Sequence, residues 1–281
     1  MARVLLCVDL SYQVYRAAAA HPMLTCRRMF TGGLYGFLQT FAKTVRETRA
    51  THVAFCQDRK PYVRSLEYPE YKQLRKKNAN DDLLKMYTES MALVVGILEG
   101  AGLNLWGIDG FESDDLIGHC VMKYRHRFDK IYGASNDSDL FQLFWADNFY
   151  VYSKGITDVM DGKGLMAKHG LTPEQFMLAT ALQGTHNDIA GIPGVGIVTA
   201  VKAVKDIPLL RKYRDSHGDL IDRNLGLIKL PHAQFPKQAC LPVTKTSFND
   251  RALYRSLGRY DIDVTGSMVQ AFEQIQQGTM T

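Results

Sequence analysis

Acidic residues recur directly after short apolar segments of this 281-residue sequence, in a pattern that suits metal-dependent chemistry. Asp9 follows the apolar run 4–8, and Asp58 follows the run 52–56. Two closer groups come later. Glu112, Asp114 and Asp115 follow the run 103–108, and Asp137 and Asp139 follow the run 130–134. Carboxylate oxygens are the ligands that Mg²⁺ and Mn²⁺ prefer. Two such ions about 4 Å apart can hold the attacking and leaving oxygens of a phosphodiester during hydrolysis.

The elements that must position these acids alternate along the chain. The apolar runs named above, together with 149–152, predict strands, and the segments between them repeat apolar residues at helical spacing. This alternation predicts an α/β fold with a mostly parallel central sheet covered by helices. Because parallel strands end at the same edge of a sheet, the acids should meet there. Gathered in this way, they would repel and raise one another's pKa unless cations were bound. Taken singly, each acid also fits a turn, a helix cap or a first helical turn.

A basic segment lies between Arg59 and Lys77. It holds seven basic and two acidic residues, with tyrosines interleaved, whereas the whole chain has a net charge of +5. Such a segment suits a polyanion, because Lys and Arg neutralise phosphates and aromatic rings can stack on bases. A solvated, lysine-rich loop or helix face is the alternative interpretation.

Helices predominate after about residue 163, and a glycine-rich loop separates two of them. Thr172 and Pro173 predict a helix start, with threonine as the N-cap and proline at the first helical position. The loop Gly191-Ile-Pro-Gly-Val-Gly196 precedes a second helix that carries Lys202 and Lys205. Glycines allow the backbone to approach a ligand, and amides at a helix N-terminus bind phosphate. The pattern is typical of a helix-hairpin-helix, and a plain glycine-rich turn between helices is the alternative.

The composition narrows the class of protein. With 46% hydrophobic and 22% charged residues, the chain has the make-up of a globular protein. No apolar stretch reaches the ~20 residues that span a bilayer, and the N-terminal apolar run is too short for a signal peptide. The five cysteines show no CxxC pairing, which predicts reduced thiols in a reducing compartment and no zinc site.

Five motifs in this order resemble those of the flap endonuclease or 5′-nuclease family. They are Asp9, Pro69-Glu-Tyr-Lys72 followed by Arg75, Gly110-Phe-Glu-Ser-Asp-Asp115, Ser135-Asn-Asp-Ser-Asp139 and the loop Gly191-Ile-Pro-Gly-Val-Gly196. The similarity covers about residues 3–205. It is greatest to the stand-alone bacteriophage members and to the 5′-nuclease domain of bacterial DNA polymerase I.

The resemblance implies an architecture and an activity. Residues 1–162 would form a PIN-like 5′-nuclease core with a helical arch at about 59–90, and residues 163–281 a helical region with the helix-hairpin-helix at about 174–205. The implied activity is that of a 5′-3′ exonuclease and structure-specific flap endonuclease, which uses two Mg²⁺ or Mn²⁺ ions and can hold K⁺ at the hairpin. DNA with free 5′ ends, flaps or nicks is the implied partner. The further implied partners are replication proteins and RNA·DNA hybrids, from which the enzyme would remove primers in an RNase H-like reaction. The protein is expected to be a monomer without membrane contact. Its expected location is the cytoplasm, or the host cytoplasm for a phage protein.

The resemblance also implies roles for single residues. The first metal group would be Asp9, Asp58, Glu112 and Asp114, with Asp115 beside it, and the second would be Asp137, Asp139 and Asp188. Lys72 and Arg75 would grip the scissile phosphate as catalytic residues at the base of the arch, and Tyr15 would stack near the 5′-terminal nucleotide. The remaining expected DNA-binding residues are Arg59, Lys60, Arg64, Lys76, Gly191, Gly194, Gly196 and Lys202.

Two departures concern the second metal group. Relatives have Gly-Asp-x-x-Asp before the hairpin, whereas this chain has Gly184-Thr185-His-Asn-Asp188, and a hydroxyl is a poorer Mg²⁺ ligand than a carboxylate. The segment from Asp188 to Gly191 is also one residue shorter than in relatives. A DNA-junction binder of the same fold that has lost hydrolysis is therefore the alternative function. A small-molecule phosphohydrolase is a third candidate, against which the basic segment and the hairpin argue.

Overall fold

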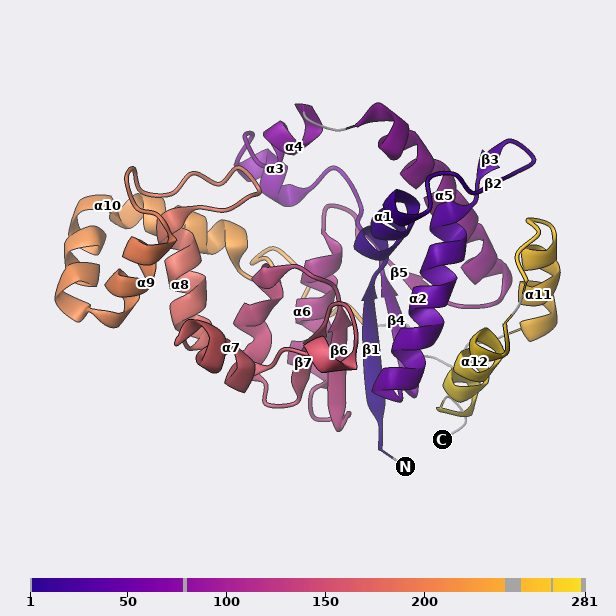
Figure 1. Ribbon diagram of the computed structural model, residues 1–281. Helices are drawn as coiled ribbons and strands as arrows, with labels where there is room; N and C mark the ends of the chain where they lie inside the picture. Colours follow the sequence, from indigo (N-terminus) through magenta and orange to yellow (C-terminus); the bar gives the residue numbers. More distant parts are fainter. Residues whose placement is uncertain (1, 78–79, 241–248, 264, 279–281) are drawn as a thin grey trace.

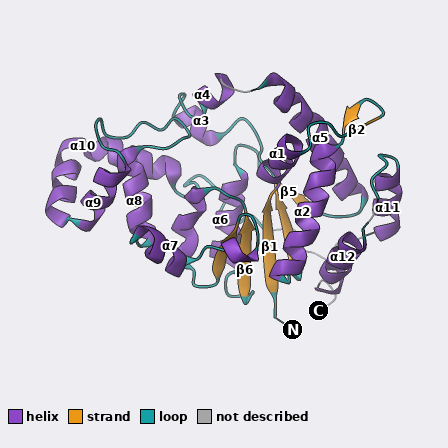
Figure 2. Cartoon of the chain, in the orientation of Figure 1, coloured by secondary structure: helices purple, strands orange, loops and turns teal. Residues whose placement is uncertain are grey.

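A five-stranded, fully parallel sheet forms the centre of the protein (Figures 1 and 2). The computed structural model describes residues 2–77, 80–240, 249–263 and 265–278, and it includes the side chains of these except 75, 76 and 276–278. The strand order is β5-β4-β1-β6-β7. These strands are β1 (Val4–Asp9), β4 (His52–Cys56), β5 (Leu105–Trp106), β6 (Lys130–Ala134) and β7 (Phe149–Tyr152). The predicted α/β class is confirmed.

Helices cover both faces of the sheet (Figure 2). One face is covered by α1 (Leu10–Ala20), α2 (Gly32–Thr48) and α5 (Asp81–Gly100), and the other by α6 (Ser113–Tyr124), the 3-10 helix η1 (Ser138–Trp145) and α7 (Gly162–His169). Side chains of β1 alternate between the two, since Leu6 and Val8 join the first apolar cluster and Leu5 and Cys7 the second. Burial on both faces explains why the strands are continuously apolar in sequence.

The basic segment forms a bridge above the carboxyl edge of the sheet (Figure 1). It contains two short helices, α3 (Val63–Glu67) and α4 (Gln73–Lys77), and leads into α5. Asn80 caps α5 by accepting a hydrogen bond from the Leu83 amide, and Asp81 and Asp82 lie in the first turn of that helix. Acids at this end suit the helix dipole.

The helical region contains a cluster of its own. The helices α8 (Pro173–Gln183), α9 (Ile197–Lys205) and α10 (Ile207–Ile228) pack on one another, as Leu182, Ala200 and Ile221 illustrate. Thr172 caps α8 as predicted, with Pro173 at its start. By contrast, α11 (Asp250–Gly258) and α12 (Gly266–Gly278) return to the first apolar cluster of the sheet. The division of the chain after residue 162 stays a prediction.

Some local predictions differ from the structure. The strand expected at 103–108 is reduced to the two residues of β5, which pair only with Phe55 and Cys56. The sequence between 206 and 248, with its scattered Pro and Gly, predicts no clear element, yet the structure contains the long α10 there, with a non-helical residue at His217. Residues 241–248 lie outside the described residues. A small hairpin of β2 (Thr25–Cys26) and β3 (Met29–Phe30) was not expected. The short helix η2 (Ile156–Asp158) follows β7.

Two expectations from composition can be compared with the structure. In the described part of the chain, no helix is both long and apolar enough to cross a membrane. All five cysteines are free thiols, of which Cys240 alone is exposed.

Candidate functional site

Asp9 lies at the centre of the carboxyl edge, where it ends β1 and caps α1. Its Oδ1 accepts hydrogen bonds from the Tyr12 amide at 3.0 Å and from the Ser113 hydroxyl at 2.9 Å. Its Oδ2 accepts a bond from the Ser135 hydroxyl at 3.0 Å. Burial, and next the charge of Asp58, raise the pKa of Asp9 to about 7. One carboxylate therefore joins the ends of β1 and β6 to the start of α6.

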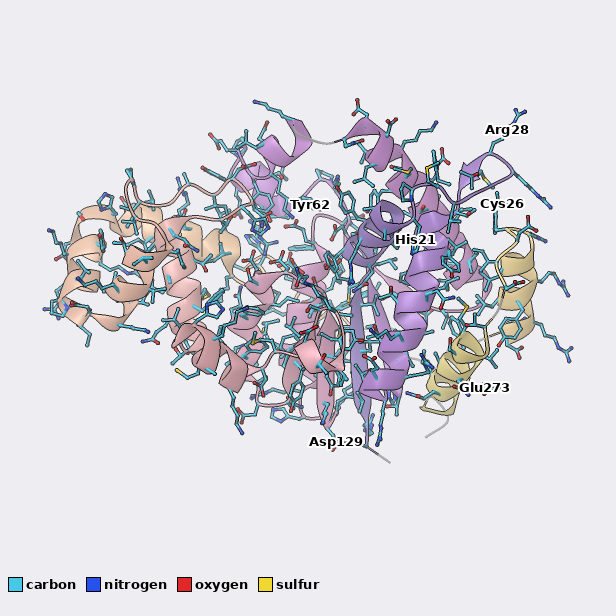
Figure 3. All side chains as sticks on the ribbon, viewed as in Figure 1. His21, Cys26, Arg28, Tyr62, Asp129 and Glu273 are labelled. Carbon is cyan, nitrogen blue, oxygen red and sulfur yellow. The ribbon has the colours of Figure 1, made fainter. Side chains whose placement is uncertain are left out.

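Asp58 faces the same point from the end of β4. Its Oδ1 accepts a hydrogen bond from the Ser113 amide at 2.7 Å, and its Oδ2 accepts one from the Tyr62 hydroxyl at 3.3 Å. Tyr62, near the start of the arch, thereby connects the arch to the edge of the sheet (Figure 3). Both carboxylates thus meet at Ser113, the first residue of α6.

Glu112 and Asp114 flank that serine. Glu112 is buried and accepts hydrogen bonds from Arg64 Nη1 at 3.1 Å, from the Tyr71 hydroxyl at 2.8 Å and from Lys72 Nζ. Asp114 differs, because its Oδ1 is buried and has no hydrogen-bond partner among the described residues. Burial, followed by the charges of Asp137 and Asp9, raises the pKa of Asp114 well above its usual value.

Asp137 and Asp139 lie at the start of η1, shortly after β6. Asp137 caps η1, and its Oδ1 accepts a hydrogen bond from the Asp139 amide at 2.8 Å. Burial and then the charge of Asp137 raise the pKa of Asp139 to about 7. The edge of the sheet therefore brings together six acids that influence one another, namely Asp9, Asp58, Glu112, Asp114, Asp137 and Asp139.

The chemistry of this cluster fits a cation. A buried carboxylate oxygen without a donor and acids whose pKa values approach neutrality are the expected cost of crowding carboxylates without a counter-charge. Within the described residues, no three acidic, histidine or cysteine side chains already surround one point closely enough to hold an ion. Divalent ions would thus bind with adjustment of these side chains.

Asp115 is not available as a metal ligand, which corrects the expectation from the sequence. Its carboxylate is fully buried and accepts four hydrogen bonds, from Arg64 Nη1 at 2.6 Å, Arg64 Nη2 at 2.7 Å, the His232 amide at 2.8 Å and the Glu112 amide at 3.2 Å. Every lone pair of this carboxylate already has a donor. The helical turn points Asp114 to the acid cluster and Asp115 to the arginine.

Arg64 was expected to bind DNA, and this expectation is wrong. Only 4% of the residue is exposed, and its guanidinium is taken up by Asp115, by Glu112 and by the carbonyls of Leu227 and Lys229. Burial opposes the charge of Arg64, but the carboxylates of Asp115 and Glu112 outweigh it and raise its pKa. Arg64 is a buried connection between the arch, α6 and the end of α10.

Lys72 also reaches the acids from the arch. Its Nζ binds Glu112 and lies over the rings of Tyr62 and Tyr71, at 5.5 and 5.2 Å from their centroids. Burial alone would lower the pKa of Lys72, yet the charges of Glu112, Asp114 and Asp58 outweigh burial and raise it. A protonated ammonium therefore stands beside the acid cluster.

The other expected DNA contacts stay predictions. The side chains of Arg59 and Lys60 are exposed at the start of the arch, and Lys60 lies over the Tyr62 ring. Tyr15 on α1 is 41% exposed and packs edge-on against Tyr87 of α5. Arg75 and Lys76 belong to α4, and their side chains lie outside the described part.

The glycine loop forms a tight hairpin between α8 and α9. Gly191 passes so close to Gln183 that a Cβ there would lie 2.2 Å from the Gln183 carbonyl carbon. Gly194 has a φ of +79°, a conformation that favours glycine. Gly196 caps α9, which begins with the exposed Ile197 and Val198 and carries the exposed Lys202. The free amides at this helix start suit a phosphate.

The residues before the hairpin lie against the arch. Asp188 Oδ2 accepts a hydrogen bond from the Leu74 amide at 2.8 Å, and the Asn187 carbonyl accepts one from the Lys72 amide at 2.9 Å. The Thr185 hydroxyl accepts a bond from the Asn187 amide at 3.1 Å. A cavity of about 650 Å³ opens beside this contact, lined by Asp188, Thr185 and Leu74 among others.

Three residues of the site were not singled out from the sequence. Ser113 and Ser135 connect the acids, and Tyr71 donates to Glu112. Each stands inside a motif quoted for its charged residues. The hydroxyls between clustered acids were the available signal, because buried carboxylates need donors.

Comparison with known proteins identifies the family of the chain. Residues 4–170 match the family model "5'-3' exonuclease, N-terminal resolvase-like domain". The chain is 28% identical over 278 residues to DNA polymerase I of Bacillus subtilis, covering 97% of this chain but only 30% of that protein. It is 30% identical over 206 residues to a 5'-3' exonuclease of Aquifex aeolicus, covering 72% of this chain and 69% of that one.

Solved structures share the fold at lower identity. A flap endonuclease of bacteriophage T5, in a pseudo-enzyme-product complex with DNA and metal ions, has a TM-score of 0.69 at 18% identity and covers 99% of this chain and 100% of its own. The catalytic core of Rad2 in complex with DNA substrate has a TM-score of 0.54 at 14% identity, covering 99% of this chain and 92% of its own. Since the family model spans more than half of the sequence, the chain belongs to the 5′-3′ exonuclease family.

Proposed function

We propose that this protein is a divalent-metal-dependent 5′-3′ exonuclease and flap endonuclease that hydrolyses DNA phosphodiesters near 5′ ends and junctions. The observation that carries the proposal is the acid cluster at the carboxyl edge, in which Asp114 Oδ1 is buried without a donor. Membership of the nuclease family and the likeness to structures solved with DNA and metal ions support it.

The chain's own residues suggest how the site would work. Asp9, Asp58, Glu112, Asp114, Asp137 and Asp139 would hold the ions. The raised pKa values of Asp9, Asp114 and Asp139 would fall as cations bind. When bound, divalent ions supply activation of the attacking water and neutralisation of phosphate charge. Lys72, with its ammonium beside Glu112, would contact the scissile phosphate and stabilise the negative charge that develops on it.

Two surfaces would hold the DNA around the cut. The hairpin amides before α9, with Lys202, would bind the phosphates of the duplex, and K⁺ is a candidate companion there. Arg59, Lys60 and Tyr15 would meet the strand that enters at the arch. Action on RNA·DNA hybrids and a role beside replication proteins are parts of the same proposal.

Cleavage of a labelled 5′-flap substrate tests the function directly. We expect hydrolysis in Mg²⁺ that EDTA abolishes. Asp114→Asn and Asp139→Asn should each lower the single-turnover rate by about 100-fold or more, with DNA affinity kept or improved because a negative charge near phosphate is removed. Asp147→Asn changes an exposed acid outside the cluster and should cleave normally.

The outcomes separate the candidate functions. Tight binding of the flap without product in Mg²⁺ or Mn²⁺ would refute the nuclease and favour a DNA-junction binder. Normal cleavage by both cluster variants would refute the site assignment while leaving the activity.

A further inference from the structure

The loop 185–190 is bonded to the arch where the arch carries Lys72. Its Asn187 carbonyl accepts a hydrogen bond from the Lys72 amide at 2.9 Å, and its Asp188 carboxylate accepts one from the Leu74 amide at 2.8 Å. Leu74 lies in the first turn of α4, where backbone amides have no partner within the helix. The two bonds hold the backbone on both sides of Gln73.

The backbone between these bonds is in an unusual conformation. Lys72 has a φ of +57° and Asp188 a φ of +63°, both in the left-handed region that non-glycine residues seldom occupy. Such conformations persist only where the surroundings enforce them. Here each left-handed residue lies beside a hydrogen bond to the other segment.

The turn directs functional side chains to the acid cluster. Tyr71 is buried against Ile189 and Ala181, and its hydroxyl donates to Glu112 at 2.8 Å. The next residue, Lys72, binds the other oxygen of Glu112. The position of the ammonium beside the acids therefore depends on how the loop holds the turn.

We infer that Asp188 is a positioning residue, whose carboxylate holds the Leu74 amide and thereby fixes the turn that places Lys72 on Glu112. This inference rests on the proposed function, and it assigns Asp188 a different task from the metal ligand that the sequence suggested. The segment that carries Asp188 is the one that is shortened and lacks the usual preceding acid, with Thr185 in its place. The Thr185 hydroxyl is used within the loop, as an acceptor for the Asn187 amide.

Two substitutions separate positioning from metal binding. Asp188→Asn keeps a side-chain oxygen that can accept from the Leu74 amide but removes the charge, whereas Asp188→Ala removes both. For a positioning residue, the single-turnover rate of the asparagine variant should stay within about 3-fold of the wild type. The alanine variant should lose about 10- to 100-fold, because small misplacements of a catalytic group have effects of that order. The flap-DNA Kd should change less than 3-fold in both.

Two readouts do not depend on cleavage. Hydrogen exchange at the Leu74 amide, followed in the metal-free protein, should speed up at least about 10-fold in Asp188→Ala and stay near wild type in Asp188→Asn. The number of bound Mn²⁺ ions, titrated without DNA, should be the same in all three proteins. Asp161→Ala is the matched control, because Asp161 caps α7 through an equal 2.8 Å bond to the Gly164 amide and should leave Leu74 exchange and cleavage unchanged.

Several results would overturn the inference. These are loss of cleavage in Asp188→Asn equal to that in Asp188→Ala, loss of a bound Mn²⁺ ion in either variant, or unchanged Leu74 exchange in Asp188→Ala. If the wild-type protein cleaves no DNA, the proposed function fails, and the exchange comparison still decides whether Asp188 holds the turn.

Discussion

Replacing Arg64 with alanine should destabilise the fold while leaving direct DNA contacts intact. The guanidinium makes two bonds to Asp115, at 2.6 and 2.7 Å, one to Glu112 at 3.1 Å, and bonds to the carbonyls of Leu227 at 2.6 Å and Lys229 at 3.1 Å. Without it, Asp115 would be a fully buried charge opposed only by backbone amides. Arg64 thus stabilises the fold through its buried ion pair with Asp115.

The size of the effect follows from this burial. Breaking a buried ion pair by removing one partner costs about 3–5 kcal/mol, because the remaining charge loses its compensation. At about 2–4 °C per kcal/mol for a domain of around 200 residues, Tm should fall by roughly 10 °C. Arg64→Lys keeps the charge but not the planar fork, and it should lie between the alanine variant and the wild type.

Thermal and urea unfolding measure this change, and Arg59→Ala is the control. Arg59 is exposed on the same segment, so its removal should alter stability by less than about 0.5 kcal/mol but reduce the salt dependence of DNA binding. Arg64→Ala should lower stability strongly and leave the salt dependence of DNA binding unchanged. A free energy of unfolding within 1 kcal/mol of the wild type, or a reduced salt slope in Arg64→Ala, would refute the structural role.

Two further predictions concern the acids and the hairpin. Without divalent ions, Tm should fall as pH rises from about 4 to 7, because Asp9, with a pKa raised from 3.8 to about 7, binds a proton in the folded state that the unfolded state releases. Over this whole range the loss of stability is about 4 kcal/mol. Mg²⁺ should restore the loss, and an equal slope in Asp9→Asn would contradict the assignment. Gly191→Ala should destabilise by at least about 2 kcal/mol in urea unfolding because its Cβ would meet Gln183, whereas Gly96→Ala in α5, with no atom within 4 Å, should be neutral or stabilising.

The sequence predicts the acid edge well because topology alone determines it. Apolar runs that alternate with helices imply a parallel sheet, and residues that follow its strands, such as Asp9, Asp58 and Asp137, must then share an edge. The same reasoning could not separate Asp114 from Asp115. They are adjacent in sequence, and only the rotation of α6 turns one toward the acids and the other toward Arg64.

Long-range pairing explains the other differences. Nothing in the basic segment distinguishes the buried Arg64 from the exposed Arg59, since the partners of Arg64 lie 48 to 165 residues away in the chain. The bond between Asp188 and Leu74 spans 114 residues, so the sequence could not predict it either. Local patterns predict elements and edges, whereas contacts between distant segments decide which charged side chains remain free.

The return of the last helices to the sheet determines the smallest stable fragment. Phe272 of α12 packs on Phe41 of α2 with ring centroids 5.6 Å apart, and Gln274 donates to the carbonyls of Val45 and Ala50. A truncation after α9 would retain every nuclease motif yet expose this apolar side of α2 to water. Such a fragment should aggregate, so a shortened version for biochemistry must keep α12 even though it lies far from the acids.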